Sequence, residues 1–243
     1  MATWQQEATA AAKLVAARKA EVDHRDQAQK EEQAREDAAG TKARADGAAV
    51  KVDLARQASD PGAIKQWLLL APLRVEGRDS EMRLDEEQLP DEGLLRPHPG
   101  GRIKVVGNYD GVEDFVWAAV RQDDYRVDLR KIVNFPINTS VGYMVTYIVS
   151  DADHSGLLMK VGSDYNAKIY LNGRAVHERR NPTTFEPDRD KVEGIGLKAD
   201  LNVLVFKIVQ ASSHGWGGSV WITEADGQPV KGIKVTLDPN AAK

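Results

Sequence analysis

Alternating apolar and polar residues mark one region of the chain most clearly, LLMKVGSDYNAKIYLNGRAVHE, from Leu157 to Glu178. The alternation stops at Ser163-Asp164 and again at Asn172-Gly173, and it resumes after each stop. Such alternation indicates strands with one buried face, and Asn-Gly supplies the two positive-φ positions of a type I′ turn. The pattern predicts three short antiparallel strands joined by tight turns, which is typical of a β-sandwich or jelly roll.

Strand-like patterns continue through most of the chain after Ile64. Phe135–Glu178 is predicted to form a continuous meander, and Leu201–Glu224 a terminal hairpin. Within the latter, Val203–Phe206 has no polar alternation, which predicts a central strand covered on both faces. Asp79–Leu95 is expected to be a loop with a helical turn, and Val127–Phe135 is either helix or strand. The predicted strands are Ile64–Leu73, Arg102–Val106, Phe115–Val120, Val141–Ser150, Leu157–Gly162, Ala167–Leu171, Ala175–Glu178, Leu201–Gln210, Ser219–Glu224 and Ile233–Leu237.

Residues 5–58 follow a different pattern, rich in Ala and charged residues, without proline and with few large apolar side chains. These strong helix formers predict a long solvated helix, or a helical hairpin broken near Gly40 and Gly47. The segment is either a stalk or a coiled coil through which the chain self-associates, although apolar heptad positions do not persist along it. Ser59-Asp60-Pro61-Gly62 marks a boundary. We therefore predict a helical segment (1–58), a linker (59–63), a β-sandwich domain (64–238) and a tail (239–243).

Composition narrows the classes of partner. The chain has 243 residues and a net charge of -4, and it contains no cysteine. The negative balance disfavours nucleic acid as a partner, and the lack of cysteine excludes disulfides and thiolate metal sites. No apolar run is long enough for a membrane helix, and residues 1–20 lack the features of a secretory signal. The chain as given is expected to be soluble and cytoplasmic, unless it belongs to a longer membrane-anchored protein.

Catalytic motifs are missing from the sequence. It contains no G-x-S-x-G, H-E-x-x-H, P-loop or G-x-G-x-x-G pattern, and the five histidines show no metal-ligand spacing. No pair of carboxylates stands out for glycoside hydrolysis. We therefore expect a protein that is not an enzyme and that requires no cofactor.

The irregular segment Asn181–Asp190, NPTTFEPDRD, holds the first candidate site. Asp188 and Asp190 are two residues apart, so they point the same way if the segment is extended, and a cation between them would relieve their repulsion. This pair is the candidate for a structural calcium site or a polar ligand contact. Neighbouring cations offer an alternative means of neutralising it: Arg179, Arg180, Arg189 and Lys191.

Two further loops carry candidate ligand-binding residues. The Gly-rich loop His214–Gly218 presents Trp216, which would suit carbohydrate stacking if it faces the solvent. Alternatively, Trp216 folds back over the end of the sandwich and fills core. His214 is a polar contact in the same loop. Tyr165, in the turn after Ser163-Asp164, is a second aromatic side chain that could stack on a sugar.

Several segments resemble a domain found at the C-terminal end of multidomain planctomycete proteins, including serine/threonine protein kinases. They are Trp67–Leu73, VGSDYNAKIYLNGRAVHE, Pro187–Asp190, LKADLNVLVFKIV and Gly215–Ser219. That domain is similar to the galactose-binding-like sugar-binding jelly roll of glycoside hydrolase family 2. The resemblance implies a galactose-binding-like β-sandwich and a non-catalytic module that binds carbohydrate or another polar ligand through its end loops. The alternative is a protein-interaction or regulatory region of a kinase-like signalling protein, because kinase signatures are missing here.

Overall fold

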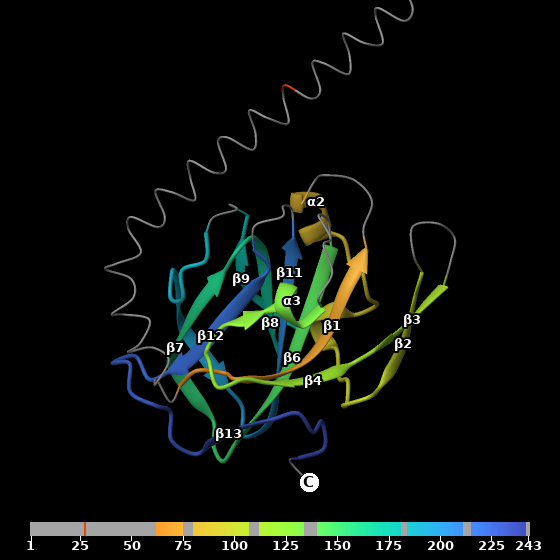
Figure 1. The fold of residues 1–243 in the computed structure, drawn as a ribbon. Helices are drawn as coiled ribbons and strands as arrows, with labels where there is room; N and C mark the ends of the chain where they lie inside the picture. Colours follow the sequence, from red (N-terminus) through yellow and green to blue (C-terminus); the bar gives the residue numbers. More distant parts are fainter. Residues whose placement is uncertain are drawn as a thin grey trace, which may run out of the picture. The chain divides into compact units, whose positions relative to one another are not determined.

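The computed structural model describes residues 62–74, 80–106, 112–133, 140–180, 184–210 and 215–241, together with Gln27. The described residues from 62 to 241 form an antiparallel β-sandwich with a few short helices, as predicted (Figure 1). The elements are β1 (Gln66–Arg74), α2 (Ser80–Asp85), η1 (Glu92–Leu94), β2 (Arg102–Val106), β3 (Val112–Val116), β4 (Ala118–Arg121), β5 (Val127–Asp128), α3 (Leu129–Val133), β6 (Ser140–Ser150), β7 (His154–Ser163), β8 (Asn166–Leu171), β9 (Arg174–Arg179), β10 (Asp190–Leu197), β11 (Asp200–Gln210), β12 (Gly217–Thr223) and β13 (Ile233–Thr236). The predicted helical segment 1–58 lies outside the described residues apart from Gln27, and so does part of the predicted linker.

The larger sheet has seven strands in the order β4-β1-β6-β11-β8-β9, with β13 paired to β6. β6 and β11 pair along their whole length, from Ser140 opposite Gln210 to Ser150 opposite Asp200. The other edge of β6 is shared, because β1 pairs with its first half and β13 with its last four residues. β6 and β11 are therefore the central strands of the molecule.

The smaller sheet has four strands in the order β10-β7-β12-β5. Consecutive strands often lie in different sheets: β7 belongs to the small sheet, and β6 and β8 to the large one. The predicted meander Phe135–Glu178 is therefore wrong, and so is the predicted hairpin Leu201–Glu224, since β11 and β12 also lie in different sheets. Only β8 and β9 form a hairpin within the predicted region. A short turn at a sandwich corner and a hairpin turn have similar residues, so the alternation pattern could not separate them.

The Asn172-Gly173 turn has the predicted geometry. Asn172 has φ 52° and Gly173 has φ 84°, the two positive values of a type I′ turn. The Asn172 side chain also accepts a bond from the backbone N–H of Val203 and donates one to Asn202, at 2.9 and 2.8 Å. These bonds fix the β8–β9 hairpin against β11.

Apolar residues cover both faces of the large sheet. The inner core lies between the two sheets and includes Trp67, Phe206 and Trp216. An outer core, including Tyr143 and Trp117, lies beneath α2, η1 and the β2–β3 ribbon, which stands beside β4 in Figure 1. Burial on both faces explains the lack of polar alternation in β11, which the sequence predicted. Trp67, Trp117 and Trp221 are all core residues.

Two strand predictions differ from the structure. The predicted strand Phe115–Val120 is divided into β3 and β4 at Trp117, whose side chain is buried in the outer core. β10 was not predicted at all, because the segment DKVEGIGL shows no clear alternation. Its pairing with β7 shifts register on both sides of Ile195, and Gly194 has φ +73°. These bulges interrupt the period of two on which strand prediction depends.

Candidate functional site

Trp216 is buried rather than presented to the solvent. Its side chain is 2% exposed, and its indole N–H donates to the carbonyl of Ile208 at 3.4 Å. Gly217 follows because no side chain fits there: a Cβ would lie 2.3 Å from the carbonyl oxygen of Val127. Of the two alternatives for Trp216, the solvent-facing one is wrong, and the structure has the other, a tryptophan folded into the core. The loop glycines permit close packing of the chain.

Asp190 has two basic neighbours. The Arg179 guanidinium donates to one carboxylate oxygen at 2.7 Å, and His177 Nε2 lies 3.2 Å from the other. Burial lowers the pKa of the His177 imidazole, which leaves Arg179 as the main cation. Asp188 is half-buried in the preceding turn. Arg179 was one of the cations expected to neutralise the pair, and among the described residues no three potential ligands gather around a metal position. Calcium binding by Asp188 and Asp190 stays a prediction.

His214 and Tyr165 are the other two residues predicted to bind a ligand. His214 lies outside the described residues. Tyr165 is half-buried in the β7–β8 turn, where its carbonyl accepts a hydrogen bond from the Ser163 hydroxyl at 3.0 Å. The turn does not close a hairpin, but carries the chain from the small sheet to the large one. Tyr165 therefore lies at an end of the sandwich, next to Asp164.

Asp164 forms an ion pair with Arg126 at this end of the sandwich. Nη2 of Arg126 donates to both carboxylate oxygens, at 3.1 and 2.8 Å. The Asp164 side chain is 8% exposed, whereas that of Arg126 is 30% exposed. The pair is therefore a buried acceptor joined to a partly exposed donor, a combination that can bind a polar group arriving from solvent.

Aromatic rings hold the guanidinium in place. The centre of the Arg126 guanidinium lies 4.4 Å from the ring centroid of Phe185, which stacks on Tyr125 at 6.3 Å. Tyr125 in turn packs against Trp221 of β12 at 5.1 Å. Cation–π contact and stacking favour one orientation of Arg126. We refer to Tyr125, Arg126, Asp164 and Phe185 as the Arg126 cluster.

Four connections meet at the Arg126 cluster. They are the β4–β5 and β7–β8 connections, residues 184–189, and Gly215-Trp216. The backbone N–H of Asp164 donates to Gly217, and the Ser219 hydroxyl donates to the carbonyl of Pro187. A Cβ on Gly215 would lie 2.6 Å from a carboxylate oxygen of Asp164. The loops chosen from sequence therefore do converge, although the charged centre is not the pair Asp188 and Asp190.

Burial and charge oppose each other at Asp164. Burial raises the pKa of its carboxyl above the ordinary value, and the Arg126 guanidinium partly offsets that rise. Within the described residues, Nη1 of Arg126 makes no hydrogen bond, and its Nε is buried without a partner. The exposed end of the guanidinium therefore keeps N–H groups that a ligand can use.

Most residues of the Arg126 cluster carry no signal in the sequence. Asp164 was interpreted as a turn residue, and Arg126 and Tyr125 carry no motif. The ion pair joins residues 38 positions apart, and nothing in a single sequence indicates such a pairing. Phe185 could have been proposed from the sequence, because it is the aromatic residue in the irregular segment Asn181–Asp190, which was already a candidate site.

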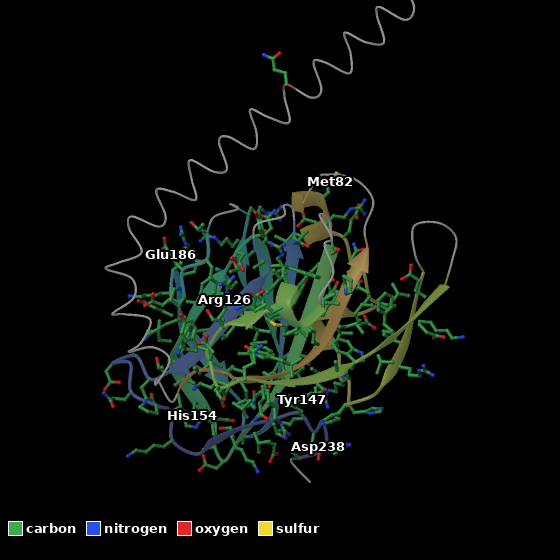
Figure 2. The ribbon with its side chains drawn as sticks, in the orientation of Figure 1. Met82, Arg126, Tyr147, His154, Glu186 and Asp238 are labelled. Atoms are coloured by element: carbon green, nitrogen blue, oxygen red, sulfur yellow. The ribbon has the colours of Figure 1, made fainter. Side chains whose placement is uncertain are left out.

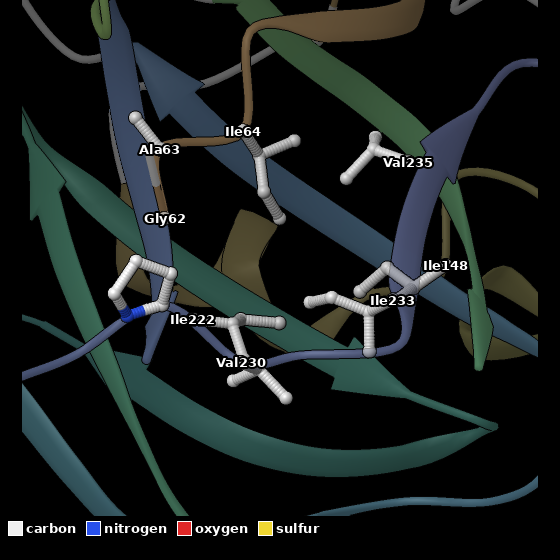
Figure 3. Close-up of a pocket in the computed structure, with 9 residues that line it drawn as sticks. Gly62, Ala63, Ile64, Ile148, Ile222, Val230, Ile233 and Val235 are labelled. Atoms are coloured by element: carbon white, nitrogen blue, oxygen red, sulfur yellow. The ribbon is translucent and has the colours of Figure 1, made fainter. Parts of the chain in front are cut away.

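A different hollow lies toward the opposite end of the strands. It has a volume of about 180 Å³ and is lined by Gly62, Ala63, Ile64, Ile148, Ile222, Pro229, Val230, Ile233 and Val235. Figure 3 shows these apolar side chains converging, and none of the described residues that line the space is charged. In Figure 2, Arg126 and Glu186 lie in the upper part of the sandwich, away from His154 and Asp238. The Arg126 cluster is thus the better site for a polar ligand.

No family model and no curated protein matches the chain. Among solved structures, it is similar to a β-glucosidase from Kluyveromyces marxianus in complex with glucose, at 12% identity and a TM-score of 0.36. That match covers 66% of this chain and 16% of the β-glucosidase.

Two other structures show similar levels of likeness. A glycosyl hydrolase family 2 member from Bacteroides cellulosilyticus DSM 14838 has 13% identity and a TM-score of 0.36, with 67% of this chain and 20% of that chain covered. The PA14 domain of the antifreeze protein MpAFP has 12% identity and a TM-score of 0.28, covering 73% and 83%. The chain therefore spans a fifth or less of the glycosidases it matches.

None of the helices in the described part of the chain has the length and hydrophobicity required to cross a bilayer.

Proposed function

We propose that this chain is a non-catalytic binding module that holds a carbohydrate or a similar hydroxyl-rich ligand at the Arg126 cluster. The observation that carries the proposal is the partly exposed guanidinium of Arg126, fixed by Asp164 and Phe185 and with Nη1 left to donate. A sugar presents neighbouring hydroxyls that both donate and accept. An arginine beside a carboxylate offers the matching donors and acceptors.

The charge of the cluster favours a neutral ligand. Arg126 and Asp164 cancel each other, so a fully anionic group would gain attraction from one and repulsion from the other. The Phe185 ring already contacts Arg126 and Tyr125, which assigns it a supporting role. Stacking on the sugar would fall to Tyr165, beside Asp164 in the same turn. This arrangement supports a galactose-binding-like module of the kind that the sequence resemblance implied.

A glycan array followed by calorimetric titration tests the proposal. We expect Arg126→Ala to weaken binding by about 10- to 100-fold, the loss for a charge-assisted hydrogen bond. Arg180→Ala is the matched control, because Arg180 is also an ion-paired arginine, but pairs with Asp85 and Glu178 elsewhere. The proposal fails if no glycan binds, or if Arg126→Ala and Arg180→Ala bind equally well.

The alternative function is a protein-interaction or regulatory region of a kinase-like signalling protein, and it is supported by the sequence resemblance. A role beside a kinase domain, and an origin in planctomycete multidomain proteins, would be supported by finding this domain behind a kinase in one chain. Self-association through residues 5–58 is likewise a proposal. Sedimentation of the full chain against residues 59–243 tests it, because equal monomer masses would reduce the segment to a spacer.

A further inference from the structure

A groove of about 470 Å³ lies between β9 and β10, away from the Arg126 cluster. These two strands are the outermost strands of their sheets, β9 in the large sheet and β10 in the small one. The groove is therefore a gap in the side of the sandwich, where neither sheet continues. We call it the edge groove.

The floor of the edge groove is apolar and belongs to the inner core. Leu171 and Ile195 are core residues, and Val176 and Val192 pack against that core while remaining partly exposed. Apolar surface left open at the side of a core is a place where a partner can add buried area. In the part of the chain that the structure describes, no aromatic side chain lines the groove, which distinguishes it from a sugar-stacking surface.

One end of the edge groove is closed by ion pairs. Asp190 at the start of β10 bonds to Arg179 and contacts His177 on β9. Toward the Asn172-Gly173 turn, no such cross-link joins the two strands within the described residues. The strands are thus held together at one end, and the space between them opens at the other.

The backbone of β9 presents free hydrogen-bonding groups to the edge groove. In a two-residue type I′ hairpin, the residues flanking the turn form the hydrogen-bonded pair, here Leu171 and Arg174. The next pair is Tyr170 and Ala175, so the N–H and C=O of Ala175 point away from β8. Ala175 lines the groove and is exposed. It is a point at which an added strand can pair.

β10 offers a poorer template for pairing than β9. Its register with β7 shifts twice, on both sides of Ile195. The register of β9 with β8 shifts once, beyond Ala175, between the pair Tyr170 and Ala175 and the pair Ile169 and His177. The bulges in β10 interrupt the regular spacing of its backbone groups. An added segment would therefore pair with β9 and pack its side chains on Val192 and Ile195.

The charged residues at the rim of the edge groove indicate which kind of ligand it binds. Arg174 and Lys198 are exposed and form no ion pair with any described residue. Among the described residues that line the groove, Glu193 is the one carboxylate. The rim therefore carries a net positive charge.

We propose that the edge groove binds an extended, acidic peptide segment of a partner protein, which adds as a strand to β9. Main-chain bonds at Ala175 supply pairing, alternate apolar side chains fill the floor, and acidic side chains meet the rim.

A nuclear magnetic resonance titration of the full chain tests this site. The probe is a blocked peptide of alternating valine and threonine with aspartate and glutamate at its ends, added to roughly 1 mM, where weak binding is detected. We expect amide shifts in Arg174–Val176 and Val192–Gly196. The same peptide with lysine at its ends should bind at least about tenfold more weakly.

Protein variants locate the interaction. Ala175→Pro removes the outward N–H and should abolish the shifts, since proline is tolerated at an edge strand. If that variant unfolds the hairpin, the exposed double change Arg174→Glu/Lys198→Glu provides the test and should weaken binding at least about tenfold. Lys231→Glu, an exposed charge reversal outside the groove, should have no effect.

Three results would overturn the proposal: no shifts at the highest peptide concentration, equal binding by the groove variants and Lys231→Glu, or shifts of the same amides by glucose oligosaccharides in place of the peptide. The inference does not depend on the Arg126 cluster. Arg126→Ala should leave the peptide titration unchanged.

Discussion

The ammonium of Lys207 lies 2.9 Å from a carboxylate oxygen of Glu92, and both side chains are shielded from solvent. Lys207 projects from β11 on the outer face of the large sheet, and Glu92 begins η1 above it. The ammonium also donates to the carbonyls of Leu84 and Glu86, at 3.1 and 2.6 Å. One lysine therefore ties the segment that contains α2 and η1 to the central strands.

Tyrosine hydroxyls complete this ion pair. Tyr143 and Tyr170 each donate to a carboxylate oxygen of Glu92, both at 2.5 Å. Burial lowers the pKa of the Lys207 ammonium, and the adjacent Glu92 carboxylate opposes that change. A buried pair of this kind is tolerated because its remaining donors and acceptors are satisfied.

The first prediction concerns removal of one partner. Lys207→Met should destabilise the fold by about 3–5 kcal/mol, because Glu92 would be left as an unpaired buried charge. The double variant Lys207→Met/Glu92→Leu should lose less than the sum of the single variants. Urea unfolding followed by tryptophan fluorescence measures each value.

Lys131→Met serves as the control for this prediction. Lys131 pairs with Asp128 at 3.6 Å, but its side chain is 84% exposed, so the change should cost under about 1 kcal/mol. Equal losses for Lys207→Met and Lys131→Met would contradict the assigned role of the buried pair.

The second prediction concerns alkaline pH. Burial, together with the Glu92 carboxylate, raises the pKa of the Tyr143 hydroxyl far above its ordinary value of about 10. Above that pH the unfolded chain releases this proton and the folded chain keeps it, so stability is present below about pH 10 and falls as pH rises. Tyr143→Phe should reduce the slope by roughly 1.4 kcal/mol per pH unit. Urea unfolding between about pH 8 and 11 measures both slopes, and equal slopes would disprove the assignment.

The third prediction concerns Gly173 in the type I′ turn. Gly173→Ala places a Cβ at φ 84° and 2.6 Å from Cδ2 of Leu94. Gly156→Ala is the matched control, because Gly156 has φ +73° but open space around the new Cβ. Each variant pays about 1–2 kcal/mol for the left-handed backbone, and Gly173→Ala should lose more because Leu94 must move. Thermal unfolding of both variants separates the backbone term from the steric term, and equal losses would show that Leu94 moves freely.

Local patterns account for what the sequence predicted correctly. The Asn172-Gly173 turn and the two-sided burial of β11 each depend on residues adjacent in the chain. Sheet membership does not, because Ser163 and Asp164 make a sandwich corner with the same turn chemistry as a hairpin. The bulge at Gly194 conceals β10 for a related reason, since it breaks the period that marks a strand.

The charged residues were harder to interpret. Lys207 lies within a strand of apolar residues, and its partner Glu92 is 115 positions away in a segment predicted only as a loop with a helical turn. Arg126 and Asp164 are separated in the same way. The sequence does not show which charges are paired, whereas pairing across the fold allows Lys207, Glu92 and Asp164 to be buried. Trp216 was also hard to interpret. A glycine-rich loop indicates an exposed tryptophan only when no other part of the chain packs against the loop, and here the side chain is buried.

The last prediction separates the two aromatic candidates for ligand stacking. Trp216→Ala should destabilise the fold by about 3–5 kcal/mol, since it empties a buried site between the sheets. Its folded fraction should bind a glycan as the unchanged protein does. Tyr165→Ala, in the half-buried turn beside Asp164, should cost less stability and should weaken glycan binding. Calorimetric titration and urea unfolding of both variants give the four values. If Trp216→Ala lost binding while retaining stability, Trp216 rather than Tyr165 would be the aromatic residue that contacts the ligand.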